Sequence, residues 1–277
     1  MNNSNTAPRV DLQALAGPVQ YAKTVTMEGF DSTVDTELRG KHLRFVASSR
    51  RLLWQALGHE YIEPELLDFI DNIPDGGVLF DIGASTGIFA MYAASHGCAV
   101  VAFEPEAANF AILSQNAFLN RMHATCQPQC FNLALSDTTG LGKIFIKKYE
   151  AGGHLKILDQ PKAVGAGTFE PEYIQPVLTF RLDDFLLQTQ TPAPQYLKID
   201  VDGTELKVLR GMPGLLQNSR LRAVFIELEE GKSDTADCLD LLDAAGFSLI
   251  AKKQVQNYLG LHNLIFERLD PGAQRTA

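Results

Sequence analysis

Short apolar runs alternate with stretches of helical spacing from about residue 77 to the end of the chain. Such runs are typical of strands buried on both faces of a parallel sheet. We therefore predict an α/β sandwich with a mostly parallel seven-stranded sheet and helices on both faces. Strands are expected at residues 78–80, 100–103, 130–135, 143–146, 177–180, 196–199, 221–226, 247–251 and 264–266, and helices at 107–120, 205–216 and 234–245.

Residues 1–75 differ from the rest, which suggests an extension before a main domain at 76–277. The first 20 residues are polar and contain proline, so we expect them to be mobile. Residues 49–58 and 64–73 have helical spacing and predict a helical cap on the sheet. A sharper alternative is that this extension also covers the active site or forms a dimer contact.

The segment 149–175 is rich in glycine and proline and has no clean period. We predict a long loop, and long loops in compact enzymes often act as lids or substrate walls.

Composition agrees with a soluble enzyme, because 45% of the 277 residues are hydrophobic and 21% are charged. A net charge of -9 argues against a nucleic-acid partner, since phosphate contacts need a basic surface. Neither a signal peptide nor an apolar run long enough to span a membrane is visible. We expect a cytoplasmic location and leave a homo-oligomer open.

The four cysteines are too scattered for a disulfide framework. Cys126 and Cys130 could supply half a zinc site, but no second pair of ligands lies nearby. We expect no zinc and predict buried, inert thiols.

The sequence from Asp81 to Glu104 reads as strand end, glycine turn, helix and second strand. An acidic residue closing the second strand can accept both hydroxyl hydrogens of a ribose. The turn has Ser85 where a dinucleotide turn has its middle glycine, so close approach to a pyrophosphate is disfavoured. The pattern favours S-adenosylmethionine (SAM), which has a ribose but no phosphate, over a nicotinamide cofactor.

A second group of polar residues surrounds the predicted strand 196–199. Asp200 ends that strand, so it should face the same crevice as Asp81 and Glu104. Asp202 and Glu205 could serve the crevice or could instead cap and complement the following helix. Lys198 should point to the other face unless its strand ends early. Glu227 is a further acidic group at this edge.

These motifs together resemble the FkbM family of SAM-dependent methyltransferases. The resemblance covers residues 75–267 and rests on segments 81–87, 100–120, 134–140, 179–186 and 197–212 and on the FIELE strand end. It implies a Rossmann-like class I methyltransferase sandwich that methylates hydroxyls of sugars or polyketides.

The resemblance also implies site residues. Asp81, Gly83, Ala84 and Gly87 would line the methionine side of SAM, Glu104 would hold the ribose, residues 132–135 would lie beside the adenine, and Asp200 would lie near the methyl. The family commonly has Asn at Ser85 and Glu at Asp202, so contacts that need those longer side chains do not carry over. The expected cofactor residues are Asp81, Gly83, Ala84, Ser85, Gly87, Glu104, Pro105, Asn132, Ala134, Leu135 and Asp200.

Methylation of an alcohol requires a base within hydrogen-bond reach of the oxygen. We name Asp200 first, then Glu227 and Lys198, with His154 as a second candidate because its ordinary pKa lies near neutrality. A magnesium ion held by the carboxylates is an alternative way to activate the hydroxyl. The expected acceptor is a sugar, a glycolipid or a polyketide-type small molecule. A nicotinamide-dependent oxidoreductase and a non-catalytic SAM-binding module stay as alternatives.

Overall fold

A seven-stranded sheet forms the centre of the protein in a computed structural model, which describes residues 24–28, 31–122, 124, 126–163, 167–256 and 258–268. Its strand order is β15-β16-β14-β13-β4-β5-β6. The strands from β14 to β6 run parallel, whereas β16 and β15 are antiparallel to their neighbours, so the predicted mostly parallel sheet is confirmed. The bounds are β4 Val78–Ile82, β5 Ala99–Phe103, β6 Gln129–Phe131, β13 Tyr196–Ile199, β14 Ala223–Glu229, β15 Phe247–Gln254 and β16 Leu261–Arg268.

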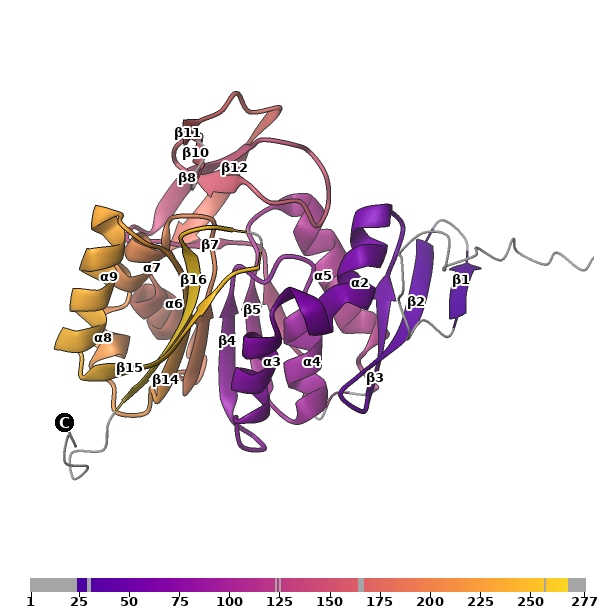
Figure 1. The fold of residues 1–277 in the computed structure, drawn as a ribbon, viewed down its shortest axis with the longest axis horizontal. Helices are drawn as coiled ribbons and strands as arrows, with labels where there is room; N and C mark the ends of the chain where they lie inside the picture. Colours follow the sequence, from indigo (N-terminus) through magenta and orange to yellow (C-terminus); the bar gives the residue numbers. More distant parts are fainter. Residues whose placement is uncertain are drawn as a thin grey trace, which may run out of the picture.

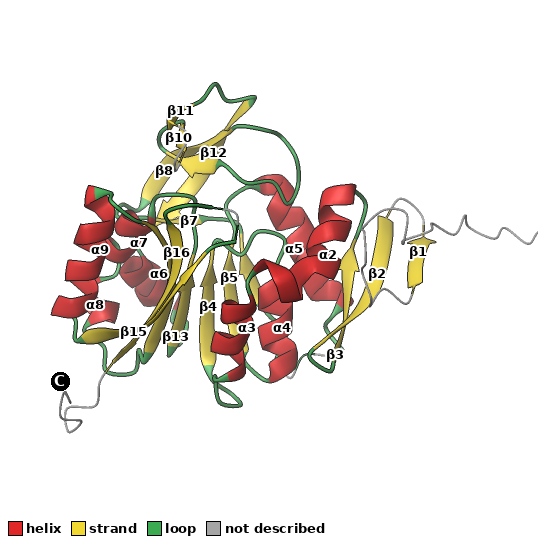
Figure 2. Ribbon diagram, viewed as in Figure 1, coloured by secondary structure: helices red, strands yellow, loops and turns green. Residues whose placement is uncertain are grey.

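Helices cover both faces of this sheet (Figures 1 and 2), as predicted. Alternate residues of each strand point to opposite faces. Leu79 and Phe225 therefore join a core with α3 (Pro64–Asp71), α4 (Ile88–His96) and α5 (Ala107–Leu119). Phe80 and Val224 join a second core with α6 (Leu182–Thr189), α7 (Glu205–Arg210), α8 (Pro213–Leu216) and α9 (Ser233–Ala244).

The amino-terminal extension contains strands as well as the predicted helices. α2 (Arg50–Ile62) and α3 match the expected helical segments, but an antiparallel sheet of β1 (Thr24–Glu28), β2 (Asp31–Leu38) and β3 (Lys41–Val46) precedes them. The prediction of helices alone was therefore wrong here. In β2 the buried Val34, Thr36 and Leu38 alternate with polar residues, a pattern that low overall hydrophobicity conceals. The first 20 residues, expected to be mobile, lie outside the described residues.

The predicted loop at 149–175 contains the short strands β9, β10 and β11 and the beginning of β12. A small sheet of order β7-β12-β8-β9 lies beside the top of the main sheet in Figure 2. Its strands are β7 Ala134–Leu135, β8 Gly140–Ile146, β9 Lys156–Leu158 and β12 Tyr173–Phe180, and the short pair β10 Lys162–Ala163 and β11 Gly167–Thr168 extends from it. The predicted strands at 130–135, 143–146 and 177–180 include parts of β7, β8 and β12. β9, β10 and β11 were missed because each has only two or three residues, too few to form a recognisable apolar run.

The predicted helix at 205–216 is interrupted. Gly211 ends α7 in close contact with a neighbouring chain segment, because a Cβ there would lie 2.0 Å from Ser136 O. Pro213 then begins α8.

The cysteines also differ from expectation in one case, because Cys126 is exposed whereas Cys98 and Cys238 are buried. Among the described helices, none is long and apolar enough to cross a membrane.

Candidate active site

Two adjoining cavities lie at the carboxyl ends of β4, β5 and β13. The inner one has a volume of about 170 Å³ and the outer one about 1500 Å³. The residues that line both define their junction. They are Trp54, Ile62, Glu63, His154, Leu158, Asp200, Asp202 and Thr204.

The turn after β4 forms one wall of the inner cavity and requires its two glycines. Gly83 and Gly87 have φ values of +81° and +82°, in the left-handed region that favours glycine. A Cβ on Gly83 would lie 1.8 Å from Asp200 O, and one on Gly87 would lie 2.3 Å from Leu113 Cδ1. Gly83 therefore lets the turn pack directly against the end of β13, where Asp200 is placed.

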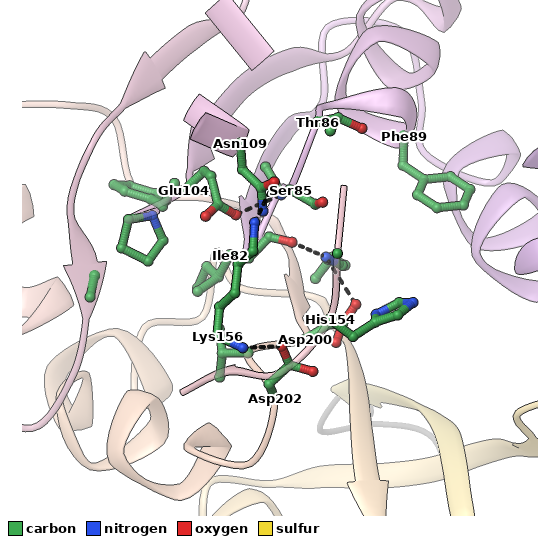
Figure 3. Close-up of a pocket in the computed structure, with 18 of the residues that line it drawn as sticks. Ile82, Ser85, Thr86, Phe89, Glu104, Asn109, His154, Lys156, Asp200 and Asp202 are labelled. Atoms are coloured by element: carbon green, nitrogen blue, oxygen red, sulfur yellow. Dashed lines mark hydrogen bonds and ion pairs between the residues drawn. The ribbon is translucent and has the colours of Figure 1, made fainter. Parts of the chain in front are cut away.

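Glu104 is a buried carboxylate at the edge of the inner cavity. Its Oε2 accepts a hydrogen bond from Ser85 N and its Oε1 accepts one from Glu106 N, both at 2.8 Å. Figure 3 shows Glu104 and Ser85 side by side. Burial raises the pKa of Glu104 to about 7, although these backbone hydrogen bonds favour its charged form. The fixed carboxylate could accept the two hydroxyls of a ribose.

Lys198 lies beneath the turn, bound to three oxygens. Its Nζ donates to Gly83 O at 2.7 Å and lies 3.2 Å from Asp81 Oδ1 and 3.4 Å from Asp200 Oδ2. Its side chain thus reaches the crevice side of the sheet. Burial disfavours the charge, but Asp81 and Asp200 outweigh it and hold the pKa of Lys198 above its ordinary value. Lys198 is therefore a fixed cation that positions Asp200.

The opposite wall of the inner cavity is apolar, formed by Leu133, Leu135 and Ile144 together with Ala134. A flat aromatic base such as adenine could pack there. Asn132 does not line the cavity. Its Nδ2 donates to Glu104 O at 2.9 Å and to Pro105 O at 3.1 Å, so it holds the turn that carries Glu104.

Of the other cofactor residues predicted from the sequence, some line the inner cavity and some lie behind its surface. Six of them line the inner cavity beside Glu104 and Asp200, whereas Asp81 and Gly87, like Asn132, lie behind its surface. The six are Gly83, Ala84, Ser85, Pro105, Ala134 and Leu135.

Carboxyl groups gather at the junction of the cavities. Asp200 keeps 28% of its side chain exposed there. Burial and the negative charge of Asp200 raise the pKa of Glu63 to about 8 and that of Glu227, in the outer cavity, to about 10. No sequence motif marked Glu63, which follows α2 and reaches the site from the extension.

Asp202 holds a chain segment across the cavities and does not cap a helix. Its Oδ2 accepts from Leu155 N at 3.1 Å and Lys156 N at 3.3 Å. Glu205 Oε1 instead accepts from Gly203 N at 2.9 Å. We call residues 152–158 the strap. His154, in the strap, is exposed and lies on the same side of the pocket as Asp200 in Figure 3.

The far side of the strap is fixed by a buried ion pair. Lys156 Nζ lies 2.5 Å from Glu106 Oε2 and 2.9 Å from Asn109 Oδ1, and the side chains of Lys156 and Glu106 are 6% and 1% exposed. Gly152 N donates to Asn109 Oδ1 at 2.8 Å, and Gly152 O accepts from Gln55 Nε2 at 3.1 Å. These partners come from α2, α5 and the strap. Sequence reasoning missed them because no local motif connects them.

The donors present suit SAM better than a metal. The glycine turn gives close backbone approach, Glu104 offers a carboxylate, and the wall opposite is apolar, which together match the parts of SAM. Among the described side chains, no group of three or more His, Cys, Asp or Glu residues is placed to hold a metal ion.

Comparison with known proteins places these features in a family. Residues 81–249 match the Methyltransferase FkbM domain. The chain is 28% identical over 214 residues to Methyltransferase 1 of Beauveria bassiana (strain ARSEF 2860), covering 70% of this chain and 83% of that protein. It is 26% identical over 218 residues to Hexuronic acid methyltransferase AglP of Haloferax volcanii, covering 78% of this chain and 82% of that protein.

A third relative is 31-O-demethyl-FK506 methyltransferase FkbM of Streptomyces tacrolimicus, which is 28% identical over 200 residues, covering 64% of this chain and 75% of that protein. The family match spans more than half of the chain and includes the glycine turn, Glu104 and Asp200. This chain therefore belongs to the FkbM family of SAM-dependent methyltransferases.

Proposed function

We propose that the protein methylates a hydroxyl group on a sugar, a glycolipid or a polyketide-type small molecule. The observation that carries this proposal is the placement of Asp200, whose partly exposed carboxylate lines both the inner and the outer cavity. The names of two relatives support the acceptor class, since one is a hexuronic acid methyltransferase and the other acts on 31-O-demethyl-FK506.

The inner cavity would hold SAM, with Glu104 on the ribose, the turn from Gly83 to Ser85 beside the methionine part, and Leu133 and Leu135 on the adenine. SAM, when bound, would supply an electrophilic methyl group. The acceptor would enter through the outer cavity, so that its hydroxyl oxygen meets the junction from the opposite side. Most of the acceleration then comes from holding the two reactants in line.

Asp200 is the best placed base among the residues named from sequence. It would take the hydroxyl proton as the oxygen attacks, and Lys198 would fix its orientation and balance its charge. Lys198 cannot act as the base, because its raised pKa keeps it as an ammonium ion without a lone pair. Glu227, with a pKa of about 10, carries its own proton near neutral pH. His154 is the second candidate, because it is exposed at the same junction.

The test compares Asp200→Asn with His154→Gln in a methyl-transfer assay against extracts and candidate glycosides. The expected result is loss of turnover in Asp200→Asn with unchanged affinity for S-adenosylhomocysteine (SAH), and a smaller effect in His154→Gln. Activity should survive EDTA, which separates this proposal from the magnesium alternative. Intact SAM affinity with no transfer to any acceptor would contradict the proposal and favour a non-catalytic SAM-binding module.

A further inference from the structure

Arg51 is a cation of the outer cavity that forms no ion pair with the described part of the chain. It lies in the first turn of α2 and lines the outer cavity but not the inner one. Its Nη2 is buried, yet no described residue accepts a hydrogen bond from it. Leaving a buried donor without an acceptor is unfavourable, and an anion bound from outside would remove that cost.

The guanidinium of Arg51 is held in a fixed position. Its Nε donates to Gly152 O, in the strap, at 2.9 Å, and its Cζ lies 5.6 Å from the centroid of the Trp54 ring. Gly152 is itself bound to Asn109 and Gln55. Arg51 is therefore oriented through Nε while its terminal nitrogens stay uncommitted. A group that is positioned in advance loses less entropy when it binds a ligand.

The other lysine and arginine residues that line the outer cavity are already paired with carboxylates of the protein. The pairs are Lys207 with Asp159 at 2.6 Å, Arg210 with Asp237 at 2.9 Å, and Lys232 with Glu229. Glu150, whose pKa is lowered by Lys148 and more weakly by Arg51, pairs with Lys148 at 2.8 Å. Of the described lysines and arginines at this cavity, Arg51 is therefore the one that an anionic ligand can use.

The acidic residues at the junction carry less negative charge than their number suggests. Burial, with a contribution from the charge of Asp200, raises the pKa of Glu63 to about 8 and that of Glu227 to about 10, so both keep their protons near neutral pH. Asp200 itself lies 3.4 Å from the cation of Lys198. A ligand can therefore place a hydroxyl at the junction and an anionic group at Arg51, which lines the outer cavity alone.

From these contacts we infer that Arg51 is a carboxylate-binding residue and that the acceptor is a hydroxy acid, whose carboxylate binds Arg51 while its hydroxyl reaches Asp200. This inference rests on the proposed function and narrows its acceptor class. The planar fork of a guanidinium matches the two oxygens of a carboxylate. One arginine balances the single charge of a carboxylate, whereas a phosphate dianion would leave excess negative charge near the acidic residues.

Trp54 reports binding directly, because it is the only tryptophan in the chain and its ring lies beneath Arg51. The probes are methyl glucuronide, methyl galacturonide and a hydroxycyclohexanecarboxylate, each beside its neutral methyl ester, titrated into SAH-saturated protein. We expect a saturable change of Trp54 fluorescence with at least one acid, and an affinity for its ester weaker by about tenfold or more. Added salt should weaken binding of the acid but not of the ester.

Variants of Arg51 test the assignment. Arg51→Gln should abolish the preference for the acid over its ester, and Arg51→Lys, which keeps the charge but loses the fork, should retain part of it. Loss of the contact with Gly152 would weaken acid and ester alike, so the ratio of the two affinities isolates the charge. Arg210→Gln is the matched control, because Arg210 lines the same cavity and pairs with Asp237, and it should keep the wild-type ratio.

Equal affinity of wild type for acid and ester, binding of none of the acids, or a preference that survives in Arg51→Gln would overturn the inference. Tighter binding of methyl glucoside phosphate than of methyl glucuronide would also overturn it, because the site would then select a phosphate. In each of these cases SAH still binds, and the methyltransferase proposal stands. Failure of SAH itself to bind would instead count against the proposed function.

Discussion

The Glu104 side chain is buried, and hydrogen bonds to the backbone fix its carboxylate. Burial raises its pKa to about 7, and two backbone N–H groups hold its carboxylate in place. An ionised Glu104 can accept hydrogen bonds from both ribose hydroxyls, whereas a protonated Glu104 has fewer acceptor sites. A proton therefore competes with the cofactor for this side chain.

This competition predicts a pH dependence of SAH affinity. Because the pKa of Glu104 is raised, the charged form is lost as pH falls through about 7, and SAH affinity should fall below that pH. Calorimetry in buffers of different ionisation enthalpy should show proton release on binding near neutrality. Glu104→Gln should remove this part of the pH dependence; a wild-type affinity that rises on acidification would contradict the assignment.

His59 predicts a pH dependence of stability. It is buried, and its Nδ1 accepts from Glu60 N at 2.9 Å, so Nε2 carries the proton and faces Thr36 Oγ1 at 3.5 Å. Burial lowers its pKa from 6.5 to about 4. The unfolded chain therefore binds a proton between these values that the folded protein does not.

The free energy of unfolding should therefore have its maximal contribution from His59 above pH 6.5. It should decrease as pH falls toward 4, by up to about 3 kcal/mol from this histidine alone. Urea unfolding at several pH values measures it. His59→Gln should lose this part of the acid sensitivity. His42→Gln is the control, since the His42 side chain is 72% exposed, and it should behave as wild type. Equal acid sensitivity in both variants would contradict the account.

The strap is held by contacts on both sides of the site. Asp202 binds its backbone from the β13 side, and Glu106 and Asn109 bind Lys156 from α5. The strap thus connects the segment after β13 with the start of α5. Its position should therefore affect how firmly the cofactor is enclosed.

Lys156→Met should weaken SAH affinity by about tenfold or more and lower the free energy of unfolding by about 3 to 5 kcal/mol, because Glu106 would be left as an uncompensated buried charge. Calorimetry and urea unfolding measure the two effects, and adding Glu106→Gln should recover part of the stability. Lys148→Met is the matched control, since its ion pair with Glu150 is at the surface. Unfolding and SAH binding like wild type in Lys156→Met would rule out a structural role for the ion pair.

How far the sequence predicts the elements depends on how each is buried. β4, β5, β13 and β14 are buried on both faces, so their apolar runs predicted them closely. β2 and β8 bury alternate residues only, and α7 and α8 are separated by a packing contact of Gly211, so their bounds could not be read from local hydrophobicity.

The candidate site likewise contains some residues that could be predicted from the sequence and others that could not. Glu104 and Asp200 end buried strands of one sheet, and the sequence therefore predicted that they face the same crevice. Gln55 and Glu63, in and after α2, and Lys156, in the strap, reach the cavities from segments far in sequence from Glu104 and Asp200. Only the tertiary fold brings them together, and no spacing along the chain encodes that contact.

The amino-terminal extension shares a hydrophobic core with the main domain. Val34, Leu43 and Phe45 belong to the same buried cluster as Met91 of α4 and Phe225 of β14. The division at residue 75 stays a prediction, but this shared core argues for cooperative unfolding of both parts.

Phe45→Ala should therefore lower the stability of the entire protein by about 3 to 5 kcal/mol in one transition. Thermal unfolding followed by both near- and far-ultraviolet circular dichroism measures it. Leu141→Ala is the control, because Leu141 is 83% exposed and should have little effect. Two separate transitions, with only the first shifted by Phe45→Ala, would show that the extension unfolds independently.

The proposed methyl transfer depends first on the binding of SAM, through Glu104, in the crevice between β4, β5 and β13. Calorimetric titration of SAH into wild type, Glu104→Ala and the exposed control Asp240→Ala tests it most directly. We expect Glu104→Ala to weaken binding by one to two orders of magnitude, about 1.5 to 3 kcal/mol for charged hydrogen bonds, and Asp240→Ala to have no effect. Folded wild-type protein that binds no SAH, or Glu104→Ala that binds it as tightly as wild type, would contradict the account.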